Sequence, residues 1–111
     1  MDERSVYFGY DQFSVPDKYD SMLMAHAAYL MAHRDIVAEV QGNCDERGSD
    51  EYNLALGKKR AEAAKSYLVD LGIDSTRIAT ISYGEERPKH DNAREETRRL
   101  NRRAALVVKV Q

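Results

Sequence analysis

Two charged residues, Asp45 and Arg60, are spaced so that a carboxylate and a guanidinium could meet across one cleft. Asp45 lies in a polar loop over residues 42–49, and Arg60 lies in the helix that this loop is expected to enter. A carboxylate holds an ammonium group, and a guanidinium holds a carboxylate, often in bidentate geometry. The pair therefore predicts a binding module that grips the zwitterionic end of an amino acid, rather than a catalyst.

The same spacing also fits a purely structural role, in which Asp45 and Arg60 pair with each other or with helix termini. Tyr52, Leu56 and Arg60 are spaced i, i+4 and i+8, so they share one side of the expected helix. That side flanks the predicted apolar stripe, and we expect Arg60 to emerge at the edge of the helix–sheet seam. Unpaired amides of the first helical turn would favour an anionic ligand group there.

The elements that must position these residues follow from hydrophobic periodicity and from turn residues. The pattern predicts strands over residues 6–10, 36–41, 77–83 and 104–110, and helices over 17–33, 50–71 and 92–100. This order predicts an α+β fold, a two-layer α/β sandwich of the form βαβαβ(α)β with a small mixed sheet. We expect residues 1–5 to be a trimmed N-terminal tail and residues 6–111 to form one domain.

Apolar stripes assign the expected core. The first helix should bury Leu23, Ala27 and Leu30, with Met22, Met24, Tyr29 and Met31 thickening that stripe. The second helix should bury Leu54, Gly57, Ala61, Ala64, Leu68 and Leu71, and Gly72 should end it. In the third strand Ala79, Ile81 and Tyr83 should share one face.

Charge and composition exclude several classes of protein. The chain has 111 residues, is 42% hydrophobic, and carries a formal net charge of −2, which argues against a general nucleic-acid binder. From Arg87 to Arg103, seven basic residues stand against three acidic ones. This segment is either a solvated helix face or a patch for an anionic partner. No apolar run reaches the length of a membrane span.

The sequence gives little support for catalysis or for a bound metal or cofactor. Cys44 is the one cysteine, and a thiol nucleophile would need a base and an oxyanion hole nearby. His26, His33 and His90 are far apart, and no cysteine and histidine have the spacing of metal ligands. We therefore predict no enzyme, no metal site and no cofactor.

Several motifs together resemble the OmpA-like peptidoglycan-binding domain. They are Gly42–Ala61, Ser82–Glu85, Arg87–Pro88 and Asn101–Arg103, joined by Val6–Asp11 in the opening strand and His26–Leu30 in the first helix. Within that superfamily the chain is most similar to the peptidoglycan-associated lipoproteins of the Gram-negative Tol–Pal system. The match extends over nearly the whole chain.

The resemblance implies non-catalytic binding of the meso-diaminopimelate in the peptidoglycan stem peptide. It implies that Asp45 accepts from the diaminopimelate ammonium and that Arg60 takes its carboxylate. Asp11 and Tyr10 would form the opposite wall of the cleft, and Leu56 would contact the aliphatic part of the ligand. The residue Asn53 is implied as a weaker candidate that shapes the loop or touches the peptide.

The resemblance also implies the protein's place and partners. The domain would tether the outer membrane to the cell wall at its periplasmic face, through an upstream anchor absent from this chain. TolB, a periplasmic propeller protein, would be a second partner that competes with peptidoglycan. The alternatives are the corresponding domain of an outer-membrane porin or a flagellar stator protein, or a domain that chiefly binds TolB.

Overall fold

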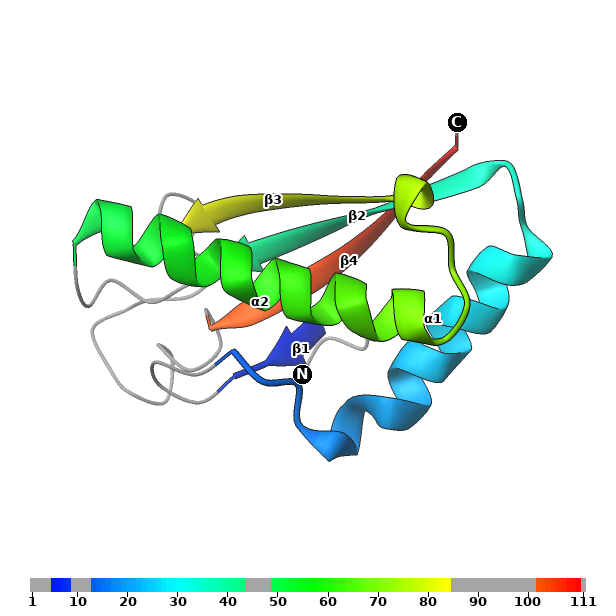
Figure 1. The fold of residues 1–111 in the computed structure, drawn as a ribbon, viewed down its shortest axis with the longest axis horizontal. Coiled ribbons are helices and arrows are strands. Elements are labelled where there is room, and N and C mark those ends of the chain that lie inside the picture. The colour runs from blue at the N-terminus through cyan, green and yellow to red at the C-terminus, as the bar shows by residue number, and fades with distance from the viewer. Residues whose placement is uncertain (1–4, 9–12, 44–48, 85–101, 111) are drawn as a thin grey trace.

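One mixed sheet organises the part of the chain that the computed structural model describes, residues 5–8, 13–43, 49–84 and 102–110 (Figure 1). Its strands are β1 (Ser5–Tyr7), β2 (Ile36–Asn43), β3 (Ile78–Gly84) and β4 (Arg103–Val110). They lie in the order β1-β4-β2-β3. β4 runs antiparallel to both β1 and β2, whereas β2 and β3 are parallel.

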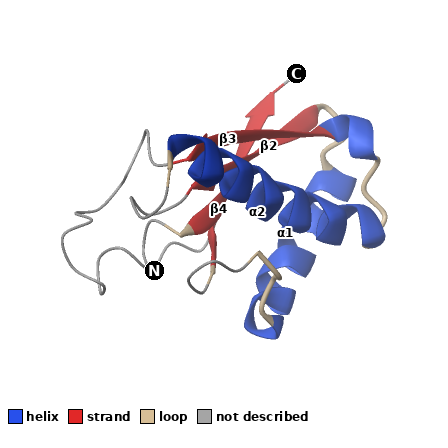
Figure 2. Cartoon of the chain, turned by 60° about the vertical axis from the view of Figure 1, so that its left-hand side comes forward, coloured by secondary structure: helices blue, strands red, loops and turns tan. Residues whose placement is uncertain are grey.

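The helices form a second layer on one face of this sheet, as Figure 2 shows. A 3₁₀ turn (Asp17–Tyr19) leads into α1 (Asp20–Ala32), and α2 (Asp50–Asp70) lies across β2, β3 and β4. A second 3₁₀ turn (Ser75–Arg77) precedes β3. The predicted α+β sandwich with a small mixed sheet is confirmed, while the helix expected over 92–100 lies outside the described residues.

The core lies between the two layers. The inward side chains of the sheet include Val6, Ala38, Val40, Ala104 and Leu106. Those of the helices include Leu23, Ala27, Leu30, Ala61, Ala64 and Leu68. All of them belong to one buried cluster, so a single core holds α1 and α2 against the sheet.

Two predictions about the apolar stripes are wrong. Leu54 is 37% exposed, because the buried side of α2 is turned so that the polar residue Asn53 faces inward instead. On α1, the residues Met24, Tyr29 and Met31 are exposed, because this helix packs along one narrow face only. The prediction from hydrophobicity alone therefore made the buried stripes of α1 and α2 wider than they are.

The strands also differ from expectation in their details. β2 continues to Asn43, two residues beyond the predicted end. In β3 the exposed residues Ala79 and Ile81 do share a face, but that face is turned away from α2. Ser82 lies on the opposite face of the strand and points toward α2. The predicted end of α2 is confirmed: Gly72 follows it with φ of +108°, a left-handed conformation that favours glycine.

Candidate functional site

The expected site residues that the structure describes lie at one end of the sheet, where β2 ends and β4 begins. Phe8 follows β1 at this end. The N-terminal half of α2 passes over this end of the sheet (Figure 1). Ser49 caps α2, since its hydroxyl accepts a hydrogen bond from the Tyr52 amide at 3.1 Å. This cap satisfies one of the amides that a helix N-terminus leaves unpaired.

A close crossing of two glycines sets the position of α2 over the sheet. A Cβ on Gly42 would lie 1.8 Å from the Gly57 carbonyl oxygen, and one on Gly57 would lie 2.3 Å from the Ser82 hydroxyl. Neither position has room for a side chain. α2 therefore lies directly on β2 at the level of Gly57, and Arg60, less than one turn later, is carried inward.

Arg60 is wholly enclosed, with 0% of its surface exposed. Its Nη1 donates a hydrogen bond to the Asn43 carbonyl oxygen at 3.1 Å. Its guanidinium carbon lies 5.3 Å from the centroid of the Phe8 ring, within the range of a cation–π contact. The expectation that Arg60 emerges at the helix–sheet seam is therefore wrong in its exposure, because the glycine crossing draws this part of α2 onto the sheet.

Two other predicted residues share the inward side of α2. Leu56, one turn before Arg60, is 8% exposed, and Asn53 is 1% exposed. The structure thus brings Asn53, Leu56 and Arg60 together along one helix face. The other three predicted site residues, Asp45, Asp11 and Tyr10, lie outside the described residues.

Three residues that take part in this arrangement were not predicted as site residues: Phe8, Asn43 and Arg102. Arg102 Nε donates to the Phe8 carbonyl oxygen at 3.2 Å, and the Phe8 amide donates to the Arg102 carbonyl oxygen at 2.8 Å. Arg102 therefore fixes the backbone that presents the Phe8 ring to Arg60. All three lie in segments that resemble the OmpA-like domain, but the sequence does not reveal which partners they contact.

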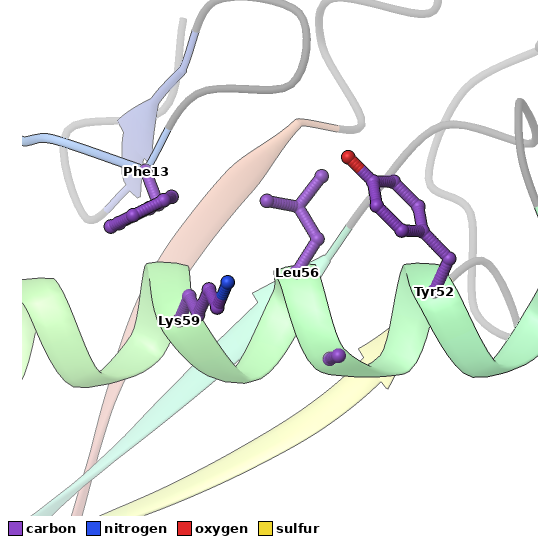
Figure 3. A pocket seen from close by; sticks show the side chains of 5 residues that line it. Phe13, Tyr52, Leu56 and Lys59 are labelled. Atoms are coloured by element: carbon purple, nitrogen blue, oxygen red, sulfur yellow. The ribbon is translucent and has the colours of Figure 1, made fainter.

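A pocket of about 230 Å³ lies next to this face of α2 (Figure 3). It is lined by Phe13, Tyr52, Ala55, Leu56 and Lys59. Leu56 belongs both to the pocket and to the helix face that carries Arg60. The arrangement can hold a ligand that has an anionic group and an aliphatic portion.

Within residues 5–8, 13–43, 49–84 and 102–110, no group of three histidine, cysteine or carboxylate side chains is placed to hold a metal ion. In the same ranges, no helix has both the length and the apolar character to span a bilayer.

The chain belongs to the OmpA family, whose sequence profile matches residues 7–102. It is 47% identical to the peptidoglycan-associated lipoprotein of Haemophilus influenzae over 106 residues, which cover 93% of this chain and 67% of that protein. The lipoprotein of the same name from Pasteurella multocida is 45% identical, with 93% and 69% covered.

Solved structures support the same assignment. The crystal structure of the peptidoglycan-associated lipoprotein from Burkholderia pseudomallei has 46% sequence identity and a TM-score of 0.93, covering 96% of this chain and 90% of that one. The C-terminal domain of Helicobacter pylori MotB shares the fold at 18% identity, with a TM-score of 0.88 over 100% of this chain and 86% of that one. The peptidoglycan-associated lipoproteins among these relatives are not an enzyme family, in agreement with the prediction of a non-catalytic domain.

Proposed function

We propose that this domain binds the meso-diaminopimelate stem peptide of peptidoglycan without cleaving it. The observation that supports this most is the placement of Arg60, held between the Asn43 carbonyl oxygen and the Phe8 ring beside a small pocket. Burying a guanidinium is costly, so a fold that encloses one needs compensating contacts. The kinship with lipoproteins named for peptidoglycan supports the same ligand.

The recognition chemistry assigns a role to each residue of the site. Arg60 takes the distal carboxylate of diaminopimelate, and Asp45 accepts from the ammonium on the same carbon. Leu56 packs on the aliphatic chain. Asp11 and Tyr10 form the opposite wall.

Asn53 has a supporting role in this proposal. It is buried one turn into α2, on the face that carries Arg60, so it shapes the site from below rather than from its rim. We expect Asn53→Ala to weaken ligand binding less than a change at Arg60 does.

Discrimination against lysine follows from the same pairing. Lysine lacks the distal carboxylate, so its binding would leave the Arg60 guanidinium without that partner in a water-poor site. A site built to hydrogen-bond a group rejects an analogue that lacks the group far more strongly than shape alone allows. The domain should therefore distinguish peptidoglycan that contains diaminopimelate from peptidoglycan that contains lysine.

In the cell, the same binding would tether the outer membrane to the wall from its periplasmic face, as part of the Tol–Pal system. Moderate affinity at each site suffices, because many anchored copies act on one polymer and retention rises with their number. TolB is the protein partner in this proposal. Competition between TolB and stem peptide, measured on the immobilised domain, would place both on one surface.

Calorimetric titration tests the proposal. The ligands are meso-diaminopimelate, a stem peptide that contains it, and the matching lysine peptide. We expect binding of the first two and none of the third, and we expect Asp45→Ala and Arg60→Ala to abolish it. Circular dichroism and urea denaturation of both variants must show a retained fold. Equal titration curves for the diaminopimelate and lysine peptides would overturn the proposal.

A further inference from the structure

The pocket beside Arg60 contains a second cationic group, which the proposed contacts do not use. Lys59 lines it together with Tyr52, Leu56 and Phe13, and the Lys59 Nζ lies 5.2 Å from the centroid of the Phe13 ring. This cation–π contact holds the ammonium at the pocket instead of leaving it to extend freely into solvent. In Figure 3 the Lys59 ammonium and the Tyr52 hydroxyl lie on opposite sides of Leu56.

Helix geometry relates this group to Arg60. Leu56 precedes Lys59 by three residues and Arg60 by four, so both side chains border the same leucine from neighbouring angles around α2. Arg60 points inward and is fully buried, whereas Lys59 is exposed. A ligand whose carboxylate reaches Arg60 therefore has Leu56 beneath its next portion, and Lys59 at the pocket beyond.

The pocket has the size and lining of a subsite. Its volume of about 230 Å³ is below the roughly 300–1,000 Å³ of pockets that enclose a whole drug-sized ligand. Phe13 and Tyr52 are 44% and 47% exposed, so aromatic surface is open to a ligand there. An aliphatic peptide segment that carries one negative charge matches two aromatic walls, a leucine floor and an ammonium.

We propose that this pocket binds the residue next to diaminopimelate in the stem peptide, and that Lys59 pairs with the free α-carboxylate of the γ-linked glutamate there. The inference rests on the proposed function, because it needs diaminopimelate at Arg60 to set the register of the peptide. Lys59 is then a specificity residue that distinguishes a glutamate carboxylate from its amidated form.

The test measures three ligands against four proteins by calorimetry. The ligands are free meso-diaminopimelate, the tripeptide alanyl-γ-glutamyl-diaminopimelate, and the same tripeptide with the glutamate α-carboxylate amidated. The proteins are the parent domain, Lys59→Met, Lys59→Arg and Lys58→Met. Lys58 is the matched control, because it is an exposed neighbouring lysine that does not line the pocket.

We expect Lys59→Met to weaken the acidic tripeptide about threefold to fivefold, which is the strength of one partly exposed ion pair. It should leave free diaminopimelate and the amidated tripeptide unchanged, and Lys59→Arg should restore most of the affinity. The parent domain should itself prefer the acidic tripeptide, by a factor that shrinks at high salt.

Three results would overturn the inference. The first is equal affinity of the parent and Lys59→Met for the acidic tripeptide, and the second is equal loss in Lys59→Met and Lys58→Met. The third is equal binding of acidic and amidated tripeptides by the parent domain. In all three cases free diaminopimelate would still bind, so the proposed function would stand. Failure of every ligand to bind the parent would overturn both.

Discussion

Arg60 is both a buried part of the fold and the residue that is proposed to bind the ligand carboxylate. An aromatic face and a strand-end carbonyl oxygen hold its guanidinium inside the domain. Both partners suit a flat, delocalised cation, which stacks on rings and presents donors in a fixed plane. A lysine ammonium carries the same charge but has neither property.

Arg60→Lys should therefore separate charge from geometry. We expect affinity for diaminopimelate to fall about tenfold or more, because the ammonium cannot make a bidentate pair with the ligand carboxylate. Calorimetry measures the affinity, and urea denaturation checks that the domain remains folded. If Arg60→Lys bound as tightly as the parent, the site would require only a positive charge at this position.

Asp74 provides a pH-dependent prediction at the same scale. Hydrogen bonds from the Thr76 amide and hydroxyl, with the nearby Arg77 charge, hold the pKa of the Asp74 carboxyl below its usual value. A lowered folded-state pKa means that the stabilising contribution is complete above the unfolded pKa and is lost as pH falls through the folded one.

Asp74→Ala should lower the urea midpoint at neutral pH, since it removes the cap of the 3₁₀ turn before β3. The difference from the parent should begin to narrow below about pH 4, where Asp74 of the unfolded chain binds a proton, and it should narrow further as pH falls through the lower pKa of the folded carboxyl. Urea titrations between neutral and acidic pH measure this. If the difference in urea midpoint stayed constant from neutral to acidic pH, the charge of Asp74 would not contribute to stability.

At the scale of elements, the crossing of α2 over β2 controls where the site lies. Glycine in the middle of a helix is ordinarily unfavourable, and replacing it with alanine gains roughly 1 kcal/mol. At Gly57 the added methyl would lie 2.3 Å from the Ser82 hydroxyl. Contact with the sheet thus outweighs helix propensity at this position.

Gly57→Ala should destabilise the domain by roughly 1–3 kcal/mol, the usual penalty for overpacking a close contact. It should also weaken ligand binding, because lifting α2 from the sheet moves Arg60 away from Asn43. The double variant Gly57→Ala/Ser82→Ala removes the clashing hydroxyl and should recover part of the stability. A gain of stability in Gly57→Ala would contradict the crossing described here.

A hydrogen bond between α1 and α2 leads to a prediction about stability at alkaline pH. The Tyr67 hydroxyl of α2 donates to the Asp20 carboxylate of α1, and this hydrogen bond raises the pKa of Tyr67. A raised folded-state pKa gives a contribution that is present below the unfolded value and lost as pH rises through the folded one. Tyr67→Phe should therefore lower the urea midpoint at neutral pH, by an amount that diminishes above about pH 10.

The sequence predicted the elements better than it predicted their faces. Alternation located β2, and the stripe Leu23, Ala27 and Leu30 located α1, because apolar residues there occupy buried positions in a regular period. The apolar stripe predicted for α2 was wrong in part, because Asn53 and Arg60 are buried there and Leu54 is not. At this candidate site polar side chains are buried, so the rule that buried positions are apolar, on which the prediction of the stripe depended, does not hold.

The same reasoning explains what could be predicted of the candidate site. Arg60 and Leu56 were singled out because charge and helical spacing are visible in a sequence. Phe8 was missed, since its contact with Arg60 depends on how β1 and α2 are brought together across the whole chain. The proposed role of Lys59 was not visible in the sequence, because it depends on a pocket to which Phe13 contributes from a distant segment.

At the scale of the whole molecule, the site joins parts of the chain that are far apart in sequence. Phe8 follows the first strand, Asn43 ends the second, and Arg102 immediately precedes the last. Arg102 and Phe8 exchange hydrogen bonds, so the two ends of the domain are fixed together beside Arg60. Ligand binding at this place should be coupled to global unfolding, because unfolding separates all of these segments.

That coupling predicts a rise in thermal stability when ligand is added. A ligand that binds the folded state alone, at one hundred times its dissociation constant, contributes about 2.7 kcal/mol. For a domain of 111 residues this corresponds to a melting temperature roughly 10 °C higher. Differential scanning calorimetry with the diaminopimelate tripeptide measures the shift, and the lysine tripeptide is the control ligand.

The pattern of shifts across variants distinguishes a specific site from weak general binding. At one fixed concentration of the acidic tripeptide, the parent should shift most, Lys59→Met slightly less, and Arg60→Lys least. Gly57→Ala should start from a lower melting temperature and also gain less from the ligand, since its defect affects the fold and the site together. Equal shifts in all four proteins would mean that the peptide stabilises the domain at some other surface, and Arg60 would then have no part in binding.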